Sequence, residues 1–366
     1  MPIFRFDNRD IHYELYGEPG QPVITLVNGL SMRTSHWAPY FKRLPELGCR
    51  VLSYDMIGQG ASSKPILGVS FDDHAVMLKA LHEHLAIENP YVMGISFGGV
   101  VALKYAHLYP DALAGLIPAS TFSELDPQLT GHARNLYIGM ARVGFEFYLD
   151  LLMPLNFTNT WMGQNQNLIE VIKRVGVASN ELFGIQNLME SLAEFESITP
   201  KLAGVRCPTL ILNAEFDSLT PRHLHDLIRL AIPGSKLVIV PKMAHAFTLE
   251  VPELTARLLA DFVHEVEQGR WVGDQSVWLA AEDPKAEPLL VPYHGEHLRW
   301  TGAPTGKPTT GKPTAAAQPA ARKKPAAPKA ATKPAARKAA AKTTASSSKP
   351  RGRPAAKRNR GSSTTG

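Results

Sequence analysis

Residues 91–110 read YVMGISFGGVVALKYAHLYP. The stretch changes from a strand pattern to a helix pattern, and this change indicates the fold. Its first part is a continuous apolar run, typical of a strand buried on both faces, and its second part favours a helix that ends at Pro110. Ser96 lies at the junction, with Gly94 two residues before it and Gly98 two residues after it. Small residues permit a sharp strand-to-helix turn that exposes the side chain at its centre, so Ser96 is a candidate nucleophile.

The same buried-strand pattern recurs along the chain, with continuous apolar runs at residues 22–30 and 50–58. Strands buried on both faces lose their alternation of polar and apolar residues, so these runs predict central parallel strands. Further strands are expected at 113–120, 208–217 and 235–241, and helices at 72–85, 221–231 and 252–267. This alternation predicts an α/β protein with a mostly parallel central sheet flanked by helices.

Two local patterns add detail to this expectation. Residues 3–15 alternate between apolar and polar side chains, which is typical of a half-exposed hairpin. The helix expected at 72–85 carries apolar residues at helical spacing, which are predicted to face the core. These residues are Ala75, Val76, Leu78, Leu81 and Leu85.

A long non-alternating stretch, residues 119–203, interrupts the α/β pattern. It reads as helical, and 13 of the 21 residues at 137–157 are Ile, Leu, Met, Val, Phe or Tyr. A helix that is apolar on most faces is either ordinary core or a cover over something apolar, and both interpretations stay open. The expected organisation is a core of residues 1–118 and 204–268, a helical cap or lid at 119–203, a small ordered extension at 269–300, and a tail at 301–366.

The formal charge of the chain is distributed very unevenly. Residues 301–366 hold 16 Lys and Arg and no Asp or Glu, which leaves 23 basic and 33 acidic side chains, a net of −10, on the rest of the chain. The tail is rich in Pro, Ala, Lys and Thr, so it is expected to be disordered. A run of positive charge without acids suits a DNA phosphate backbone, although a merely solubilising end is the alternative.

The tail resembles linker-histone C-termini and the Lys-Pro-Ala-Ala tails of some bacterial DNA-associated proteins. Arg351, Gly352 and Arg353, between two prolines, are similar to the core of an AT-hook. In such a motif the extended backbone lets both arginines enter a narrow A·T minor groove. The resemblance implies that DNA is a partner of residues 301–366.

The strand–GISFGG–helix arrangement within an α/β pattern resembles the α/β-hydrolase superfamily over residues 1–268. The resemblance implies an α/β-hydrolase fold and a catalytic triad in the order Ser, Asp, His. Asp217 in LILNAEFDSLTP matches the acid and His245 in KMAHAFTLEVPE matches the base. Glu215 and Glu124 are the alternative orienting acids.

Further positions match the family less directly. YDMIGQGASSKP matches a loop of the family in which the residue at Asp55 has a structural role. His82 and His84, on the helix before the nucleophile, are also expected to be structural.

The resemblance also implies an oxyanion hole made of two backbone N–H groups. One belongs to Phe97, directly after the nucleophile, and the other is expected from Leu30 in the loop VNGLSMRTSHW. In this loop Asn28 precedes Gly29, where the commonest family form has a His-Gly pair. Asn at this point is similar to the enol-lactonase branch and to hydroxyacyl transacylases that use carrier thioesters.

Other classes of chemistry find no support in the sequence. No cluster of His, Cys or Asp has metal-ligand spacing, and neither a Walker loop nor a dinucleotide fingerprint occurs, so no metal and no cofactor is expected. The serine at position 96 excludes the family members that use an aspartate nucleophile. Cys49 and Cys207 read as buried apolar residues, which indicates a reducing compartment.

The sequence also suggests a location. There is no secretory signal and no apolar run long enough to span a membrane, so a soluble, cytoplasmic protein is expected, with association to the nucleoid as a further location.

The function expected from these residues is hydrolysis of a carboxylic ester or thioester with an apolar acyl group, through a Ser-His-Asp acyl-enzyme. Two enzyme alternatives remain open: acyl transfer, such as 3-hydroxyacyl transfer between carrier thioesters, and hydrolysis of an enol-lactone-like lactone. The alternative of another class is a DNA-binding or scaffold protein with an incidental hydrolase body. The acyl group, the acceptor and the oligomeric state are left open.

Overall fold

The computed structural model describes residues 2–293. Arg351, Gly352, Arg353 and the rest of the basic tail lie outside the described residues. Within residues 2–293, no helix is both long enough and apolar enough to cross a bilayer. Cys49 and Cys207 are buried and unpaired, and burial raises the pKa of both thiols to about 12.

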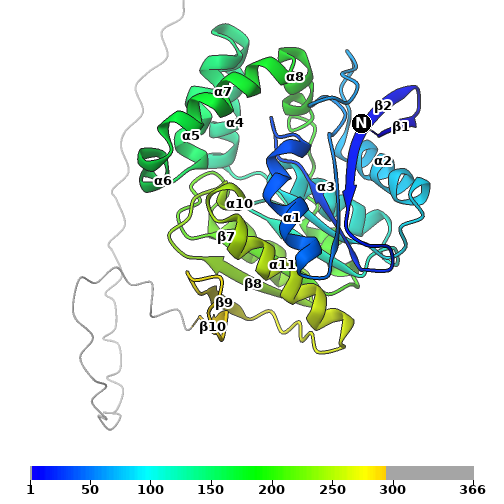
Figure 1. Ribbon diagram of the computed structural model, residues 1–366. Coiled ribbons are helices and arrows are strands. Elements are labelled where there is room, and N and C mark those ends of the chain that lie inside the picture. The colour runs from blue at the N-terminus through cyan, green and yellow to red at the C-terminus, as the bar shows by residue number, and fades with distance from the viewer. Residues whose placement is uncertain (1, 294–366) are drawn as a thin grey trace, which may run out of the picture. The chain divides into compact units, whose positions relative to one another are not determined.

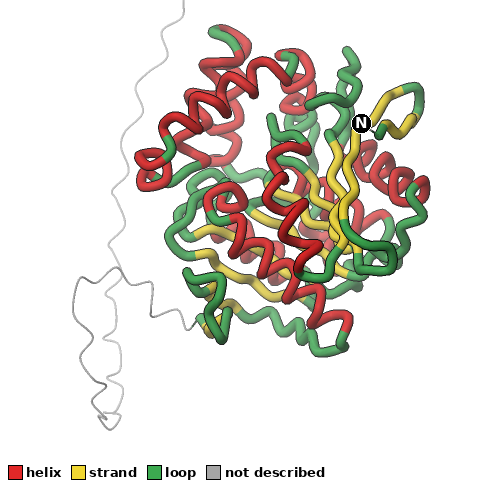
Figure 2. Tube along the Cα trace, in the orientation of Figure 1, coloured by secondary structure: helices red, strands yellow, loops and turns green. Residues whose placement is uncertain are grey.

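A central sheet of ten strands forms the body, and the prediction of a mostly parallel sheet flanked by helices is confirmed (Figures 1 and 2). The strands run in the order β1-β2-β4-β3-β5-β6-β7-β8-β9-β10. Only the pairs β1/β2, β2/β4 and β9/β10 are antiparallel. The strands are β1 (Ile3–Phe6), β2 (Arg9–Tyr16), β3 (Val23–Val27), β4 (Arg50–Tyr54), β5 (Tyr91–Ile95), β6 (Gly115–Ala119), β7 (Thr209–Ala214), β8 (Ser235–Val240), β9 (Val277–Ala280) and β10 (Leu290–Pro292).

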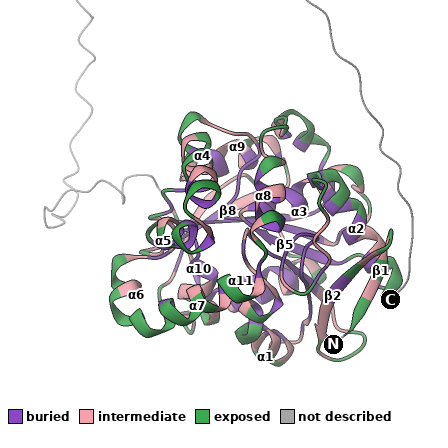
Figure 3. Cartoon of the chain, turned by 90° about the horizontal axis from the view of Figure 1, so that it is seen from above, coloured by how far each residue is buried: buried purple, intermediate pink, exposed green. Residues whose placement is uncertain are grey.

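Helices cover both faces of this sheet, because the central strands are apolar on both sides. The helices α1 (Ala38–Glu46) and α11 (Pro252–Glu267) pack on one face with one buried cluster of apolar side chains. The second cluster lies on the other face, under α2 (Phe71–His84), α3 (Phe97–Leu108) and α9 (Arg222–Ala231). Figure 3 shows central strands such as β5 and β8 buried between these layers. Short helices complete the body: η1 (Thr34–Trp37), η2 (Thr199–Gly204) and α10 (Phe247–Glu250).

The predicted core face of α2 is wrong at one position. Ala75, Leu78 and Leu81 are buried, but Val76 is 41% exposed. Successive residues of an α-helix are about 100° apart, so Val76 cannot share the face of both Ala75 and Leu78. His82 lies on the buried face instead, where its ring nitrogens contact Thr25 Oγ1 at 2.9 Å and the Tyr105 hydroxyl at 3.0 Å.

Five α-helices lie between β6 and η2 and gather at one end of the body, drawn in green in Figure 1. They are α4 (Pro127–Arg142), α5 (Phe145–Asn156), α6 (Asn159–Gln164), α7 (Gln166–Ser179) and α8 (Leu182–Glu190), and they are called the cap below. The apolar stretch at 137–157 is divided between α4 and α5 rather than forming one helix. Gly144, which has a φ of 129°, makes the break, because this conformation ends a right-handed helix.

The segment after α11 extends the sheet. The strand β9 pairs in parallel with β8, and β10 pairs antiparallel with β9. Sequence patterning did not predict β9, whose four residues are only partly buried apart from Ala280. Short strands at a sheet edge have a weak periodic signal, and their pairing partner decides their conformation.

Candidate active site

Ser96 lies in the turn between β5 and α3 and has a φ of 54°, a left-handed conformation that is rare for residues other than glycine. Its backbone N–H donates to the Ala119 carbonyl at 2.9 Å. Its carbonyl accepts a hydrogen bond from Thr121 Oγ1 at 2.7 Å. Backbone strain of this kind costs about 1–3 kcal/mol and persists only where surrounding contacts impose it.

The two flanking glycines are needed because other backbone comes too close for a side chain. A Cβ on Gly94 would overlap the Gly98 carbonyl. A Cβ on Gly98 would overlap the carbonyls of Val27 and Asn28 at the end of β3. The two glycines therefore permit the turn, and the end of β3 packs directly against it.

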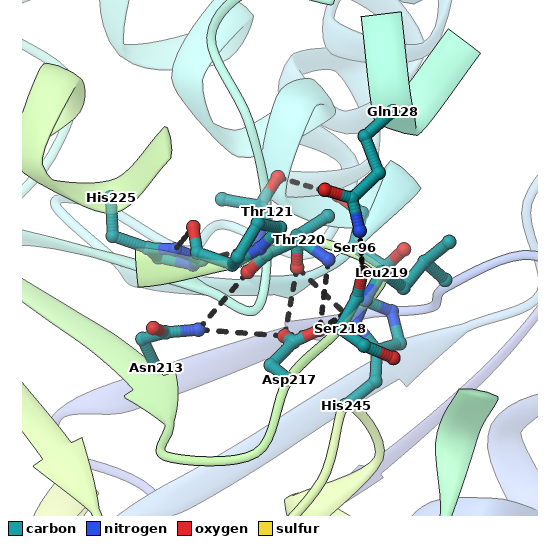
Figure 4. A network of polar contacts seen from close by, with 11 residues as sticks. Ser96, Thr121, Gln128, Asn213, Asp217, Ser218, Leu219, Thr220, His225 and His245 are labelled. Carbon is teal, nitrogen blue, oxygen red and sulfur yellow. Dashed lines mark hydrogen bonds and ion pairs between the residues drawn. The ribbon is translucent and has the colours of Figure 1, made fainter. Parts of the chain in front are cut away.

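Asp217 and His245 lie together at the carboxyl edge of the sheet, in the loops after β7 and β8. His245 Nδ1 is 3.0 Å from both Asp217 Oδ1 and Asp217 Oδ2, and each residue is only 4% exposed. The strands β5, β6, β7 and β8 are neighbours and parallel, so their carboxyl ends bring Ser96 to the same edge. Figure 4 shows the three residues in one close view.

A turn that begins at Asp217 surrounds the carboxylate with donors. The backbone N–H groups of Leu219 and Thr220 donate to Oδ1 at 3.0 and 2.8 Å, and Thr220 Oγ1 donates to Oδ2 at 2.8 Å. Asn213 Nδ2 lies 3.4 Å from Oδ2 (Figure 4). Burial opposes ionisation, but attraction to His245 and these hydrogen bonds outweigh it, and the pKa of Asp217 is lowered.

The contact with Asp217 determines which nitrogen of His245 can act as a base. An ionised Asp217 accepts a hydrogen bond from His245 Nδ1–H, so the ring proton stays on Nδ1 and Nε2 has the free lone pair. Nε2 is therefore the atom that can act as a base.

The two alternative acids are engaged elsewhere. Glu215 Oε2 accepts the backbone N–H of Lys242 at 2.8 Å. Glu124 Oε2 accepts the hydroxyls of Thr199 and Ser197 at 2.8 and 3.2 Å. Asp217 is thus the acid that the structure places against His245.

The loop after β3 lies beside the Ser96 turn. Gly29 packs against Ile95, the residue before Ser96, and an added Cβ would sit 3.4 Å from its carbonyl oxygen, in van der Waals contact. Leu30 is partly exposed at this point. Phe97 is the first residue of α3, where N–H groups have no partner inside the helix and the helix dipole favours negative charge. Both positions suit donors to an oxyanion.

Asn28 has a structural task in this loop. Its side chain is fully buried, Nδ2 donates to the Tyr54 carbonyl at 2.9 Å, and Oδ1 accepts from Trp37 Nε1 at 2.7 Å. Both ends of the amide are therefore occupied by protein groups. The side chain ties the loop to β4 and η1 rather than offering a group to substrate.

Asp55 fixes the neighbouring loop. Its two carboxylate oxygens accept the backbone N–H groups of Thr34 and Ala61, both at 2.7 Å. Burial raises the pKa of this carboxyl, although the two N–H donors oppose that effect.

His225, on α9, is not among the residues predicted from the sequence, and it supports the Ser96 turn. Its Nε2 accepts the backbone N–H of Thr121 at 2.9 Å, so the ring proton is on Nδ1, 3.4 Å from the Pro221 carbonyl. Thr121 in turn holds the carbonyl of Ser96. No local motif marks His225, because its role depends on a contact with a residue 104 positions away.

Three buried histidines, His74, His82 and His225, predict a loss of stability in mild acid. Burial lowers their pKa values to about 4, about 3 and about 4, whereas an unfolded chain titrates near 6.5. Below about pH 6.5 the unfolded state binds protons that the folded state does not, so the free energy of unfolding falls until the pH nears 4. We expect each histidine to contribute up to about 1.4 kcal/mol per pH unit, measured by urea unfolding at pH 7, 6 and 5.

A pair of variants isolates one of these histidines. His82→Gln keeps hydrogen-bonding capacity but cannot titrate, so the dependence on pH should become shallower. His84→Gln, two residues away on the exposed side of α2, should leave the dependence of stability on pH unchanged. Equal slopes for both variants and the parent protein would contradict this account.

Several known proteins are similar to this chain in sequence or in fold. A sequence profile described as "alpha/beta hydrolase fold" matches residues 22–252. "Putative carbamate hydrolase RutD" of Azorhizobium caulinodans is 25% identical over 274 residues, which cover 73% of this chain and 100% of that protein. A thermophilic esterase from Thermogutta terrifontis has a similar structure, with a TM-score of 0.64 and 26% identity over 70% of this chain and 94% of the esterase. An enol-lactonase from Burkholderia xenovorans LB400 shares the fold, with a TM-score of 0.65, 22% identity, and coverage of 72% and 100%.

Proposed function

The chain belongs to the α/β-hydrolase fold family, and we propose that it is a serine hydrolase that cleaves carboxylic esters or thioesters through an acyl-enzyme. The observation that carries the proposal is the buried contact between His245 Nδ1 and Asp217, at the sheet edge that also holds the strained Ser96 turn.

The proposed reaction uses each of these groups in turn. Ser96 Oγ attacks the substrate carbonyl while His245 Nε2 takes its proton, and Asp217 stabilises the imidazolium that forms. The N–H groups of Phe97 and Leu30 receive the developing oxyanion. His245 then passes the proton to the leaving alcohol or thiol. A water molecule, activated by the same imidazole, releases the acid and regenerates Ser96.

The apolar cap supports an apolar acyl group as substrate. Met153, Phe157 and Ile169 form a buried cluster with Ala246, the residue after His245. The Ala246 N–H also donates to the Asn156 carbonyl at 2.8 Å. Apolar side chains of this region therefore pack against the residue that follows His245.

A series of p-nitrophenyl esters and matching thioesters, from acetyl to dodecanoyl, tests the acyl preference. Each methylene buried in an apolar site contributes about 0.8 kcal/mol, so kcat/KM should rise roughly fourfold per methylene until the site is filled. A flat or falling series from acetyl upward would contradict the apolar acyl site. An aryl carbamate and a lactone belong in the same panel, because relatives and structural neighbours carry those names.

Acyl transfer is the second candidate, because the same triad serves any acceptor. The Asn-Gly pair at Asn28, which is similar to hydroxyacyl transacylases, favours including it. Product analysis with an added alcohol or thiol acceptor separates the two reactions. A new ester or thioester as the main product would identify the enzyme as an acyltransferase rather than a hydrolase.

We also propose that residues 301–366 bind DNA and bring the enzyme to the nucleoid. The full chain should shift duplex DNA in a gel, and a chain ending at residue 300 should not. If six to ten phosphates are contacted, affinity should fall about 10³–10⁵-fold between 50 and 200 mM salt. Equal binding by both chains would show that the tail is not the DNA-binding segment. Equal binding by a variant without Arg351 and Arg353 would show that the AT-hook-like core is not needed.

A further inference from the structure

The turn that carries Leu30 contains a second strained residue. The backbone N–H of Met32 donates to the Gly29 carbonyl at 3.3 Å, which closes a four-residue turn. Ser31, the third residue of this turn, has a φ of 64°. Turns with a positive φ at this position strongly favour Gly or Asn, so the serine needs outside contacts to remain there.

Those contacts come from the cap. Ser31 Oγ donates to the Tyr148 hydroxyl at 3.1 Å, and Asn180 Nδ2 donates to the Ser31 carbonyl at 3.3 Å. Tyr148 is fully buried, and Ser31 and Asn180 are 9% and 7% exposed. Hydrogen bonds in such a low-dielectric setting are stronger than at the surface, and losing one partner leaves the other unsatisfied.

Asn180 joins three segments at this place. Its Oδ1 accepts the backbone N–H of Gly60 at 3.4 Å, in the loop after β4, and its Nδ2 also approaches the Gly176 carbonyl of α7 at 3.3 Å. Nearby, an Arg33 guanidinium nitrogen donates to Ser179 Oγ at 2.9 Å. The end of α7 is thus bonded to the loop that follows β3.

We propose that Tyr148 and Asn180 are positioning residues for the oxyanion hole. They hold Ser31 in its left-handed conformation and thereby set the direction of the Leu30 N–H beside Ser96. The proposal rests on the proposed function, because it assigns a task to cap residues in that reaction. Removing an oxyanion donor outright lowers kcat by about 10²–10³-fold. A misdirected donor should therefore cost less, about tenfold.

The test compares two matched pairs of variants. Tyr148→Phe and Asn180→Ala should each lower kcat about tenfold, with KM changed less than twofold. Their affinity for a trifluoromethyl ketone, which mimics the tetrahedral oxyanion, should fall by the same factor as kcat. Tyr137→Phe removes a hydroxyl that bonds Glu190 elsewhere in the cap, and Asn187→Ala removes an amide that bonds the Pro65 carbonyl. Both controls should keep the parent kcat.

A rescue variant keeps the test independent of general damage to the fold. Glycine adopts a positive φ without a Cβ penalty, so Ser31→Gly in the Tyr148→Phe background should recover most of the lost kcat. Thermal unfolding of every variant is followed by circular dichroism.

Several results would overturn the inference. One is a Tyr148→Phe enzyme whose kcat equals that of the Tyr137→Phe control. Another is a change in KM without a change in kcat. An impaired single variant that glycine does not rescue would also overturn it. Failure of the proposed function looks different, because then even the parent protein would not be labelled at Ser96 by a fluorophosphonate.

Discussion

Replacing Ser96 by alanine is expected to lower kcat for p-nitrophenyl esters by a factor on the order of 10⁶, because no acyl-enzyme can form without its hydroxyl. Labelling by a fluorophosphonate should disappear at the same time, and mass spectrometry of the parent protein should locate the label on Ser96. The free energy of unfolding should change little, since alanine keeps the Cβ of Ser96 in the same backbone conformation and the lost hydroxyl belongs to a partly exposed side chain.

Ser197→Ala is the matched control for this experiment. Ser197 is an exposed serine whose hydroxyl contacts Glu124 at 3.2 Å, away from the β5–α3 turn. Its loss should leave both kcat and labelling unchanged. Retained esterase activity in a Ser96→Ala protein that is free of contaminating enzyme would end the assignment of Ser96 as nucleophile.

Asp217→Asn is expected to lower kcat about 10⁴-fold, the size seen when a triad acid becomes an amide and holds the imidazole in the wrong tautomer. The surroundings of Asp217 make the substitution severe. Leu219, Thr220 and Asn213 all direct donors at its oxygens, so the new NH₂ group would face donors instead of acceptors. Stopped-flow measurement of acylation and deacylation should show both steps slowed.

The alternative acids are the controls for this prediction. Glu215→Gln and Glu124→Gln should keep kcat within about threefold of the parent protein, because their carboxylates bond Lys242 and Thr199 rather than His245. A loss in Glu124→Gln as large as in Asp217→Asn would transfer the orienting role to Glu124.

Features carried by a few adjacent residues could be predicted from the sequence. Unbroken apolar runs such as 22–30 predict strands buried on both faces, and the sheet contains them as β3 and β5. The Ser96 turn was recognisable because two glycines and a strand-to-helix change lie within a few residues. Val76 was misplaced because it lies about 100° and 200° around the helix from Ala75 and Leu78, which are buried.

Features that depend on remote contacts could not be predicted in this way. His225 supports Thr121 across 104 positions, and Tyr148 meets Ser31 across 117. Neither contact leaves a periodic pattern or a short motif around either partner.

Local residue patterns predicted the α/β class and the place of the Ser96 turn, because burial pattern and turn chemistry are properties of adjacent residues. The resemblance to a known family supplied the candidates Asp217 and His245. Three further features became visible in the folded chain: Asp217 rather than Glu215 faces His245, the side chain of Asn28 bonds to protein groups, and the cap bonds to Ser31. These outcomes depend on which groups meet when strands and loops far apart in sequence come together, and a hydrogen bond exists only where both partners arrive at the right distance and angle.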